Sequence, residues 1–410
     1  IVGSYYLLLI IATTLVKAVG VVYRTVQGYN ATKRADKVDW HKRLADLEDP
    51  HGSYEKLMPV KSREFEFDEH VENLKMISVG KDLVISEKEL DDNGKTPKIV
   101  FPKPNEIYHA VIMVAYNEGL DTLIPTVEAV KKSSFPNERT IFVFGYEERG
   151  GEAMRENAKI LVEKFKDDFC QFIPVMHPKD LKDEIQGKGP NLNYAAGELV
   201  NYVKKAKIPI ENVIVTSLDS DNKMSKWYLD YVAYQFIVHP NRQKLSYQPV
   251  SLFTNNIWDA PAPMRIIAIS NSFFNIISSM RSHTLKNFAS HSQPLLALSQ
   301  MGFWSKKTIV EDGHQYWRSL FYFHGDYEVL PIHVVMEETF LKTLKAQFIQ
   351  LRRWDYGASD VAYVGVRLFS KDRKSIGKMS FMPLFAKFMR LLEGHVTLAA
   401  ISPMVAFGGW

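Results

Sequence analysis

The sequence predicts an α/β fold in which a mostly parallel sheet is flanked by helices. Short apolar runs rich in Val, Ile and Phe alternate with longer segments whose apolar residues recur every three or four positions. Strands that alternate with helices favour parallel pairing through right-handed crossovers. The chain has 410 residues, 46% of them hydrophobic and 24% charged, so it can bury a large core and exceeds one average domain.

The middle of the chain holds the alternating elements in order. Four short apolar runs predict strands at 108–116, 140–146, 170–177 and 213–218. Helical periodicity predicts helices between them at 119–133, 151–165 and, after a Gly-rich loop, 191–206. In such sheets, ligands bind beyond the carboxyl ends of the strands.

The N-terminal end predicts a transmembrane helix, assigned to residues 1–24. Residues 5–23 are apolar apart from Lys17, and ~20 apolar residues cross a bilayer as a helix. By the positive-inside rule, the basic residues that follow place the rest of the chain in the cytoplasm: Arg24, Lys33, Arg34 and Lys37. The alternative, a cleaved signal peptide, needs a charged n-region that is absent. Residues 25–105 are expected to form a cytoplasmic linker with helical segments.

The C-terminal end is also expected to lie at the membrane. One helical face within 378–394 collects Phe381, Leu384, Phe385, Phe388, Met389 and Leu392. This pattern is typical of a helix in the membrane interface, although a core helix looks similar. We assign 358–394 to an interfacial amphipathic region and 395–410 to the start of a further transmembrane helix. The chain is therefore expected to be an excerpt of a larger integral protein of the plasma or another cell membrane.

Composition excludes several classes of protein. The net charge of +4 is too small to argue for nucleic-acid binding. Cys170 is the single cysteine, so a disulfide framework is excluded, and no Cys/His pairs have zinc-site spacing. A reducing, cytoplasm-facing compartment fits best.

Acidic and amide residues follow three of the expected strands: Asn117 and Glu118, Glu147 and Glu148, and Asp219 and Asp221. Each pair alone is also typical of a surface turn. Parallel strands, however, bring these ends to one edge of the sheet, where carboxylates repel one another unless a cation neutralises them. Mg²⁺ and Mn²⁺ prefer oxygen ligands and often complete their coordination with phosphate.

A glycine-rich loop supplies a complementary element. Gly187 and Gly189 allow the backbone to approach a ligand, and Lys188 can meet a phosphate. The spacing is not that of a Walker motif.

Two later motifs add further polar residues. TIVEDGHQYWR carries Glu311 and Asp312, and QFIQLRRWDYG carries Gln350, Arg353 and Trp354 as Q-x-x-R-W. Each has a structural alternative, because the acidic pair can cap a helix and Q-x-x-R-W can be an amphipathic turn.

Taken in order, VAYNE, an acidic second strand end, GKGxNxN, DSD, ED and QxxRW resemble the family 2 glycosyltransferases. The resemblance runs from about Tyr108 to Gly357 and points to the membrane-embedded branch, which includes cellulose, chitin and hyaluronan synthases and ceramide glucosyltransferase. It implies a GT-A-like, Rossmann-type domain over 106–357.

The resemblance also implies roles for individual residues. Asp221, together with Asp219, is expected to hold Mg²⁺ or Mn²⁺. Asp312 is expected to be the general base, with Glu311 beside it, and Trp354 is expected to border the acceptor. The residues expected to bind the donor are Asn117, Glu118, Glu147, Lys188, Asp219, Gln350 and Arg353.

These residue types suit glycosyl transfer. Charge builds on the departing diphosphate, which a metal and Arg353 stabilise. The attacking hydroxyl loses a proton, which needs one carboxylate and predicts inversion at the anomeric carbon.

We therefore expect an inverting hexosyltransferase that uses a nucleotide-sugar donor, UDP-linked by resemblance. The expected acceptor is a glycan at the membrane, as in polysaccharide synthesis, with membrane lipid as a neighbour and no nucleic acid. The alternatives are a single addition to a lipid acceptor and an inactive scaffold domain.

The chain departs from the family pattern at several points. It is open whether Glu147 or Glu148 reaches the nucleoside, and Val310 precedes E-D where polymerising relatives commonly have Thr. The loop that follows His177 and the segment around Asn255 match no family motif.

Overall fold

The computed structural model describes residues 2–78, 100–370 and 379–407, with the side chains of 2–7, 9–11, 13–14 and 396–407 outside the described part. Its strands are β1 (Tyr108–Ala115), β2 (Thr140–Glu147), β3 (Gln171–His177), β4 (Val213–Asp219), β5 (Lys223–Met224), β6 (Leu245–Leu252), β7 (His291–Pro294) and β8 (Glu328–Glu337). The helices up to the middle of the chain are α1 (Val2–Ala35), α2 (Trp40–Ala45), α3 (Pro50–Leu57), α4 (Phe67–Ser78), α5 (Leu120–Lys131), α6 (Gly151–Phe165) and α7 (Lys188–Lys205). The later helices are α8 (Tyr228–Val238), α9 (Ala262–Ser279), α10 (Leu295–Gln300), α11 (Glu311–Tyr322), α12 (Leu344–Asp355), α13 (Ser359–Phe369) and α14 (Phe381–Phe407).

The strands form an eight-stranded sheet in the order β3-β2-β1-β4-β7-β6-β8-β5. β3, β2, β1 and β4 pair in parallel, which confirms the alternating half that the sequence predicts. Beyond β4 the sheet is mixed, since β7 runs antiparallel to β4 and β6, and β8 is parallel to β6 but antiparallel to β5. The expectation of a mostly parallel sheet therefore holds for the first half only.

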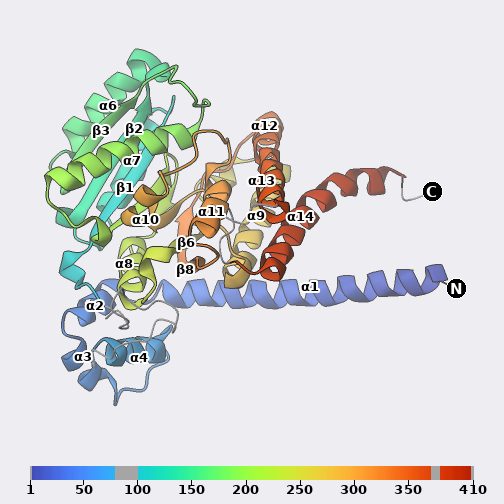
Figure 1. Cartoon of the computed structure of the whole chain (residues 1–410), viewed down its shortest axis with the longest axis horizontal. Coiled ribbons are helices and arrows are strands. Elements are labelled where there is room, and N and C mark those ends of the chain that lie inside the picture. Colours follow the sequence, from blue (N-terminus) through green and yellow to red (C-terminus); the bar gives the residue numbers. More distant parts are fainter. Residues whose placement is uncertain (1, 79–99, 371–378, 408–410) are drawn as a thin grey trace.

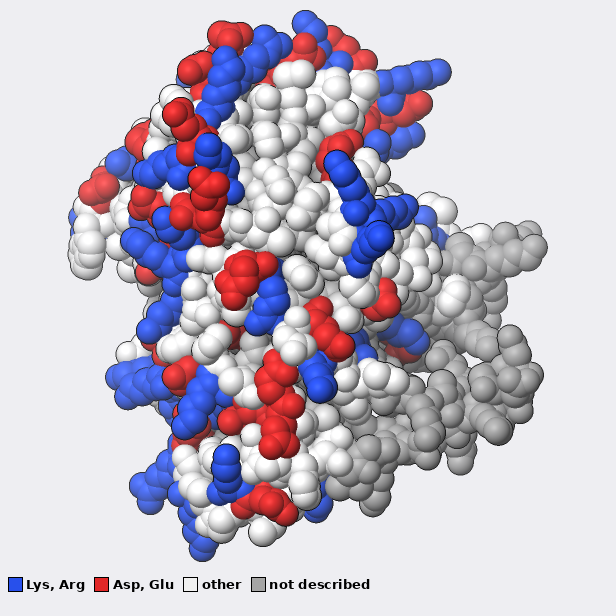
Figure 2. Space-filling view, turned by 90° about the vertical axis from the view of Figure 1, so that its left-hand side faces the viewer, with Lys and Arg blue, Asp and Glu red and all other residues white. Residues whose placement is uncertain are grey.

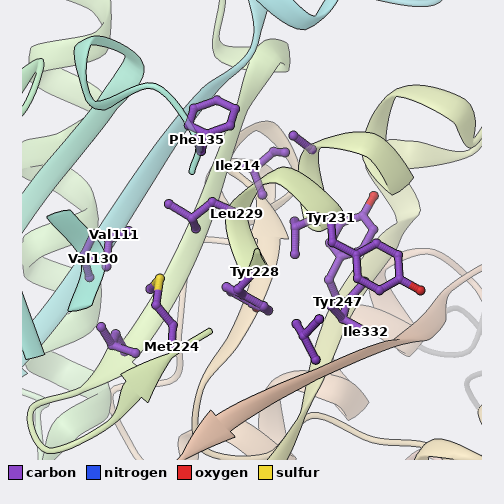
Figure 3. Packing of buried hydrophobic residues seen from close by; sticks show 14 of the residues in the cluster. Val111, Val130, Phe135, Ile214, Met224, Tyr228, Leu229, Tyr231, Tyr247 and Ile332 are labelled. Carbon is purple, nitrogen blue, oxygen red and sulfur yellow. The ribbon is translucent and has the colours of Figure 1, made fainter. Parts of the chain in front are cut away.

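Helices cover both faces of the sheet because alternate residues of each central strand point to opposite sides. Val111 and Met113 of β1 join a core with α5, α6 and α8, whereas Ala110 and Ile112 join a core with α7 and α10. Figure 3 shows part of the first core, with Val111 beside Val130 of α5. Each fully buried aliphatic side chain of this kind contributes ~1.5–3 kcal/mol.

The segment after α1 packs on the domain. Trp40 of α2 stacks on Tyr231 of α8 with ring centroids 3.4 Å apart, and its indole N–H donates to the carbonyl of Ala35 at 2.9 Å. Leu44 and Leu74 belong to the same core as β1. Residues 25–105, which were expected to be a linker, include α2, α3 and α4, and both α2 and α4 contact α8. Residues 79–99 lie outside the described part.

No helix among the described residues is long and apolar enough to cross a membrane. The transmembrane prediction for 1–24 is therefore not supported. The residues predicted to begin a further membrane helix, 395–410, fall largely outside the described side chains. In Figure 1, α1 and α14 extend from the domain toward the same side, where both termini lie.

The apolar face predicted within 378–394 belongs to α14 and packs on the domain. Leu384, Phe388 and Leu391 are buried in a cluster with Trp317 of α11 and Val364 of α13. This packing agrees with the core-helix alternative. Other apolar side chains of the same region stay exposed: Val366, Phe369, Met382 and Met389.

Charged side chains of both signs are spread over the face of the molecule seen in Figure 2. Among the coloured residues of that face, Lys and Arg are intermingled with Asp and Glu. This face therefore presents no extended field of one sign to a polyanion.

Candidate active site

The residues singled out from the sequence meet in one cleft at the carboxyl ends of β1, β2 and β4. The cleft has a volume of about 710 Å³. It is lined by every predicted site residue: Asn117, Glu118, Glu147, Lys188, Asp219, Asp221, Glu311, Asp312, Gln350, Arg353 and Trp354. A larger cavity of about 810 Å³ lies between α1, α5 and β5 and contains none of them.

The D-x-D turn at the end of β4 is held through its backbone. The side-chain amide of Asn255 donates to the carbonyl of Asp221 at 3.0 Å, and the hydroxyl of Thr339 donates to the same oxygen at 3.2 Å. The Thr126 hydroxyl donates to the carbonyl of the intervening serine at 2.7 Å. The carboxylates of Asp219 and Asp221 thus remain available to the cleft, and the otherwise unexplained Asn255 positions their turn.

Lys188 supplies the positive charge at the centre of the cleft. Its ammonium contacts the Asp219 carboxylate and lies 3.5 Å from Oε1 of Glu311. Burial alone would lower the pKa of Lys188, but Asp219 and Glu311 together raise it. Lys188 therefore stays charged and neutralises part of the carboxylate cluster.

The acidic side chains bind their protons more tightly than usual. Burial and the neighbouring Asp219 raise the pKa of Asp221 to about 6. Burial raises the pKa of Glu311 to about 7, in spite of the Lys188 ammonium. Burial also raises the pKa of Asp312. The cleft lining holds seven carboxyl groups beside the cationic side chains of Lys188, Arg149 and Arg353, an excess that favours a cationic ligand.

Glu338 is a cleft residue that the sequence reasoning missed. It follows β8 and is 9% exposed. Burial raises its pKa to about 8, and Asp219 and Asp221 add to the increase. Its position just beyond a strand end is the same signal that revealed Asp219, but β8 was not among the predicted strands.

Glu311 and Asp312 form the first turn of α11. The helix begins after Val310, which makes no side-chain capping bond, and Asp312 accepts from the N–H of Gly313 at 2.7 Å. A helix N-terminus favours negative charge, which opposes the effect of burial on the two carboxyl groups without outweighing it. Glu311 is buried, whereas Asp312 is partly accessible from the cleft.

The Q-x-x-R-W residues lie on α12 at the mouth of the cleft. Gln350, Arg353 and Trp354 stand at positions i, i+3 and i+4, which share one helical face. Trp354 is 43% exposed, so its ring is accessible to a ligand. The helix also exposes apolar residues outside the cleft, among them Leu344, Phe348 and Ile349.

The two strand-end glutamates differ in position. Glu147 lines the cleft, but its carboxylate already accepts from Arg149 at 2.7 and 3.0 Å. Glu148 turns elsewhere and accepts from the N–H of Lys179 at 3.0 Å. A donor-binding role for Glu147 stays a prediction, because Arg149 already pairs with its carboxylate.

The glycine loop is shaped by packing within the protein. A Cβ on Gly189 would lie 2.5 Å from the carbonyl oxygen of Ser305 and 3.1 Å from Cβ of Glu311. At Gly187 a Cβ would meet nothing within 4 Å, and its backbone is extended. Our expectation that both glycines serve ligand approach is therefore wrong for Gly189, whose missing side chain lets α7 contact the α11 turn.

Gly189→Ala should destabilise the protein by ~1–3 kcal/mol, the usual cost of overpacking. It should also lower activity, because Glu311 and Lys188 lie at the contact. Gly197→Ala on the same helix is the matched control, since a Cβ there meets nothing within 4 Å. The control should stabilise by ~0.5–1 kcal/mol. Denaturant unfolding of both variants tests this, and an equal effect at the two sites would contradict it.

No family model and no curated protein matches this chain. Solved structures that resemble it include glycosyltransferases. One is a mannosyltransferase from Pyrobaculum calidifontis in complex with GDP-Man and Mn²⁺, with 13% identity and a TM-score of 0.45, covering 92% of each chain. S. aureus TarS 1–349 in complex with UDP-GlcNAc has 13% identity, a TM-score of 0.44 and coverage of 71% of this chain and 73% of that chain. GalNAc-T7 with UDP, GalNAc and Mn²⁺ has 11% identity, a TM-score of 0.39 and coverage of 70% and 58%.

Proposed function

We propose that this protein is an inverting glycosyltransferase that moves a sugar from a nucleotide-diphosphate donor to a hydroxyl acceptor. The observation that carries the proposal is the composition of the cleft. A two-carboxylate turn with a partly buried lysine, a third carboxylate at a helix N-terminus, and an arginine–tryptophan pair all line the same cavity. The carboxylate turn, the lysine and the arginine suit a diphosphate with its cation, the third carboxylate suits an attacking hydroxyl, and the tryptophan suits a sugar ring.

Asp219 and Asp221 would hold Mg²⁺ or Mn²⁺. Within the described residues, no group of three or more His, Cys, Asp and Glu side chains is arranged to hold a metal ion. Two carboxylates still fit these ions, which are commonly held by one or two carboxylates plus substrate phosphates. The excess negative charge of the cleft also suits a divalent cation. When bound, the ion would stabilise the charge that develops on the departing diphosphate.

The other cleft residues have separate roles in proton transfer and in binding the two substrates. Asp312 accepts the proton of the attacking hydroxyl, and the buried Glu311 shapes the field around it. Arg353 and Gln350 bind the diphosphate, and Lys188 moves from Asp219 toward phosphate oxygens when a donor enters. Asn117 and Glu118 border the donor at the β1 end, and Trp354 offers an apolar face to the acceptor sugar. One carboxylate on the acceptor side gives a single displacement, and therefore inversion.

We further propose family 2 membership, a UDP-sugar donor and a glycan acceptor at a membrane, with the catalytic domain in the cytoplasm. Supporting features are the exposed apolar residues Leu15, Val16 and Val19 of α1 and Phe348 and Ile349 of α12. The projection of α1 and α14 to one side of the domain agrees with this arrangement. A single addition to a lipid acceptor is the second candidate, because the same exposed surface would bring the cleft close to lipid.

A panel of nucleotide sugars tests the proposal. Purified protein should release nucleoside diphosphate from one of UDP-, GDP- or dTDP-linked sugars when Mn²⁺ or Mg²⁺ is present, and excess chelator should stop the release. Sizing the glycosylated product then separates polymerisation from a single addition. Absence of release across the panel, in protein shown to be folded, would contradict the proposal.

A further inference from the structure

Five charged side chains form a continuous chain beside the cleft, with alternating sign. Arg149 Nη2 lies 2.7 Å from Oε2 of Glu147, and the same oxygen lies 3.5 Å from Nδ1 of His177. His177 Nε2 lies 2.9 Å from Oε2 of Glu184, whose Oε1 lies 2.7 Å from the ammonium of Lys306. We call these residues the charge chain.

The centre of the charge chain is buried. The exposed fractions of the His177, Glu147 and Glu184 side chains are 7%, 5% and 7%. His177 Nε2 hydrogen-bonds to Glu184, whereas Nδ1 is within ion-pair distance of Glu147 without a hydrogen bond. Two buried carboxylates on either side of one imidazole favour its protonated form. Burial lowers the pKa of His177, but the neighbouring carboxylates of Glu147 and Glu184 outweigh this effect and raise the pKa overall. The ring edge of Tyr194 of α7 is the remaining neighbour, at 5.4 Å between centroids.

One end of the charge chain places a cation in the cleft. Glu147 accepts from Nε and Nη2 of Arg149, and the guanidinium lies 5.0 Å from the ring centroid of Tyr116. Arg149 and Tyr116 both line the cleft. Two hydrogen bonds and a cation–π contact hold the guanidinium in place, so its remaining N–H groups point in a defined direction.

The other end holds the loop that leads into α7. Lys306 pairs with Glu184, and the N–H of Ile185 donates to the carbonyl of Lys306 at 3.0 Å. Gln186, Gly187 and Lys188 follow directly and line the cleft. The charge chain therefore connects the ends of β2 and β3 with the loop that positions Lys188.

The order of the sheet indicates which part of a donor meets Arg149. β1 and β2 lie on one side of β4 in the sheet, and β6 and β8 lie on the other. In Figure 1, α11 and α12 lie on the side of β6 and β8. With the diphosphate at Asp219 and Asp221 and the sugar toward Asp312, the nucleoside extends toward β1 and β2. Arg149 and Tyr116 stand there, offering hydrogen-bond donors to ribose or base oxygens and a ring face to the base.

We propose that His177 is a positioning residue for the donor: as an imidazolium between Glu147 and Glu184, it holds Arg149 against the nucleoside and Lys188 against the phosphates. The inference rests on the proposed function, because it needs a nucleotide in the cleft. When His177 loses its proton, two buried carboxylates face a neutral ring. Glu147, which holds Arg149, and Glu184, which holds the loop before Lys188, are then no longer joined by a shared cation. A histidine with a raised pKa contributes stability that is complete below its unfolded pKa of ~6.5 and lost as the pH rises through the folded value.

The experiment measures UDP and GDP binding in the presence of Mn²⁺ by calorimetry between about pH 6 and pH 9. Wild-type affinity should fall at the high end, about tenfold for each pKa unit of coupling. His177→Gln should bind about tenfold more weakly at low pH and lack this fall. His51→Gln is the control, because His51 is 72% exposed and pairs only with Glu55. Asp221, Glu311 and Glu338 change the affinity in the opposite direction, because their ionisation at higher pH favours Mn²⁺ binding. This effect is common to the wild type and both variants.

NMR of the histidine-labelled wild type provides a second readout that does not depend on the variant folding. Since protonation and nucleotide binding are coupled reciprocally, saturating UDP or GDP should raise the His177 pKa further. An unchanged His177 titration, or wild-type affinity and pH profile in His177→Gln, would overturn the inference and leave the proposed function standing. If UDP, GDP and dTDP all fail to bind the wild type at any pH, the proposed function fails, and this inference fails with it.

Discussion

Replacing Asp312 with asparagine should lower turnover by about 10²-fold or more while leaving donor binding nearly intact. Asparagine keeps the shape and the contact with the Gly313 N–H but cannot accept a proton, and general-base catalysis typically contributes roughly 10²–10⁴-fold. The proton leaves the acceptor only in the transition state, so donor affinity should change by less than about tenfold. A turnover assay beside a calorimetric donor titration measures both quantities.

The matched control is Asp326→Asn. Asp326 is 59% exposed, pairs with Lys244 and does not line the cleft. It should retain wild-type turnover, because an exposed pair contributes little to stability. If Asp312→Asn keeps near-normal turnover, Asp312 acts only at the start of α11, and the catalytic assignment is wrong.

Asp221→Asn should abolish the dependence of donor binding on the divalent ion. The expected loss of turnover is ~10²–10³-fold, as for removal of a group that stabilises developing charge. Asn255 and Thr339 hold the backbone carbonyl of residue 221, so the turn should keep its shape in the variant. Donor titrations with Mn²⁺ and with excess chelator should differ strongly for the wild type and little for Asp221→Asn.

The pH dependence of the same site gives a second expectation. Because the pKa of Asp221 is raised to about 6, protonation below that value should weaken the response to Mn²⁺. Full activity of the wild type in excess chelator, or an undiminished Mn²⁺ response in Asp221→Asn, would contradict the role of this turn.

Half of the sheet could be predicted because its residues carry local signals. β1, β2 and β4 are short apolar runs, and the intervening helices show a period near 3.6. β7 has no such signal, since its residues His291–Pro294 are polar yet buried. Side-chain bonds hold that strand, such as the one between Thr216 and Ser292 at 2.7 Å, and these depend on partners far away in the chain.

The candidate site was predictable where chemistry and strand position coincide. Asp219 and Asp221 follow an apolar run, so their place at the sheet edge follows from the pattern. Glu338 follows β8, whose run is interrupted by polar residues and by Pro331, and it was missed. The charge chain could not be predicted from the sequence either, because Glu147, His177 and Lys306 belong to separate segments that only the fold brings together.

The ends of the chain show a limit of periodicity. An apolar helical face predicts burial without indicating the partner, and lipid and protein satisfy it equally. On α14 the face around Leu384 and Phe388 packs against α11 and α13. On α1 the exposed Val16 and Val19 have no such cover among the described residues, and the membrane prediction for that helix stays a prediction.

The anomeric configuration of the first product tests the central account most directly. Proton NMR of the reaction, started with an α-linked nucleotide sugar, resolves the anomeric proton of the new glycosidic bond before it can equilibrate. One carboxylate at Asp312 and one diphosphate leaving toward Asp219 and Asp221 predict a β-linked product from a single displacement. An α-linked product would show retention of configuration, which a single back-side displacement does not give, and it would contradict the mechanism.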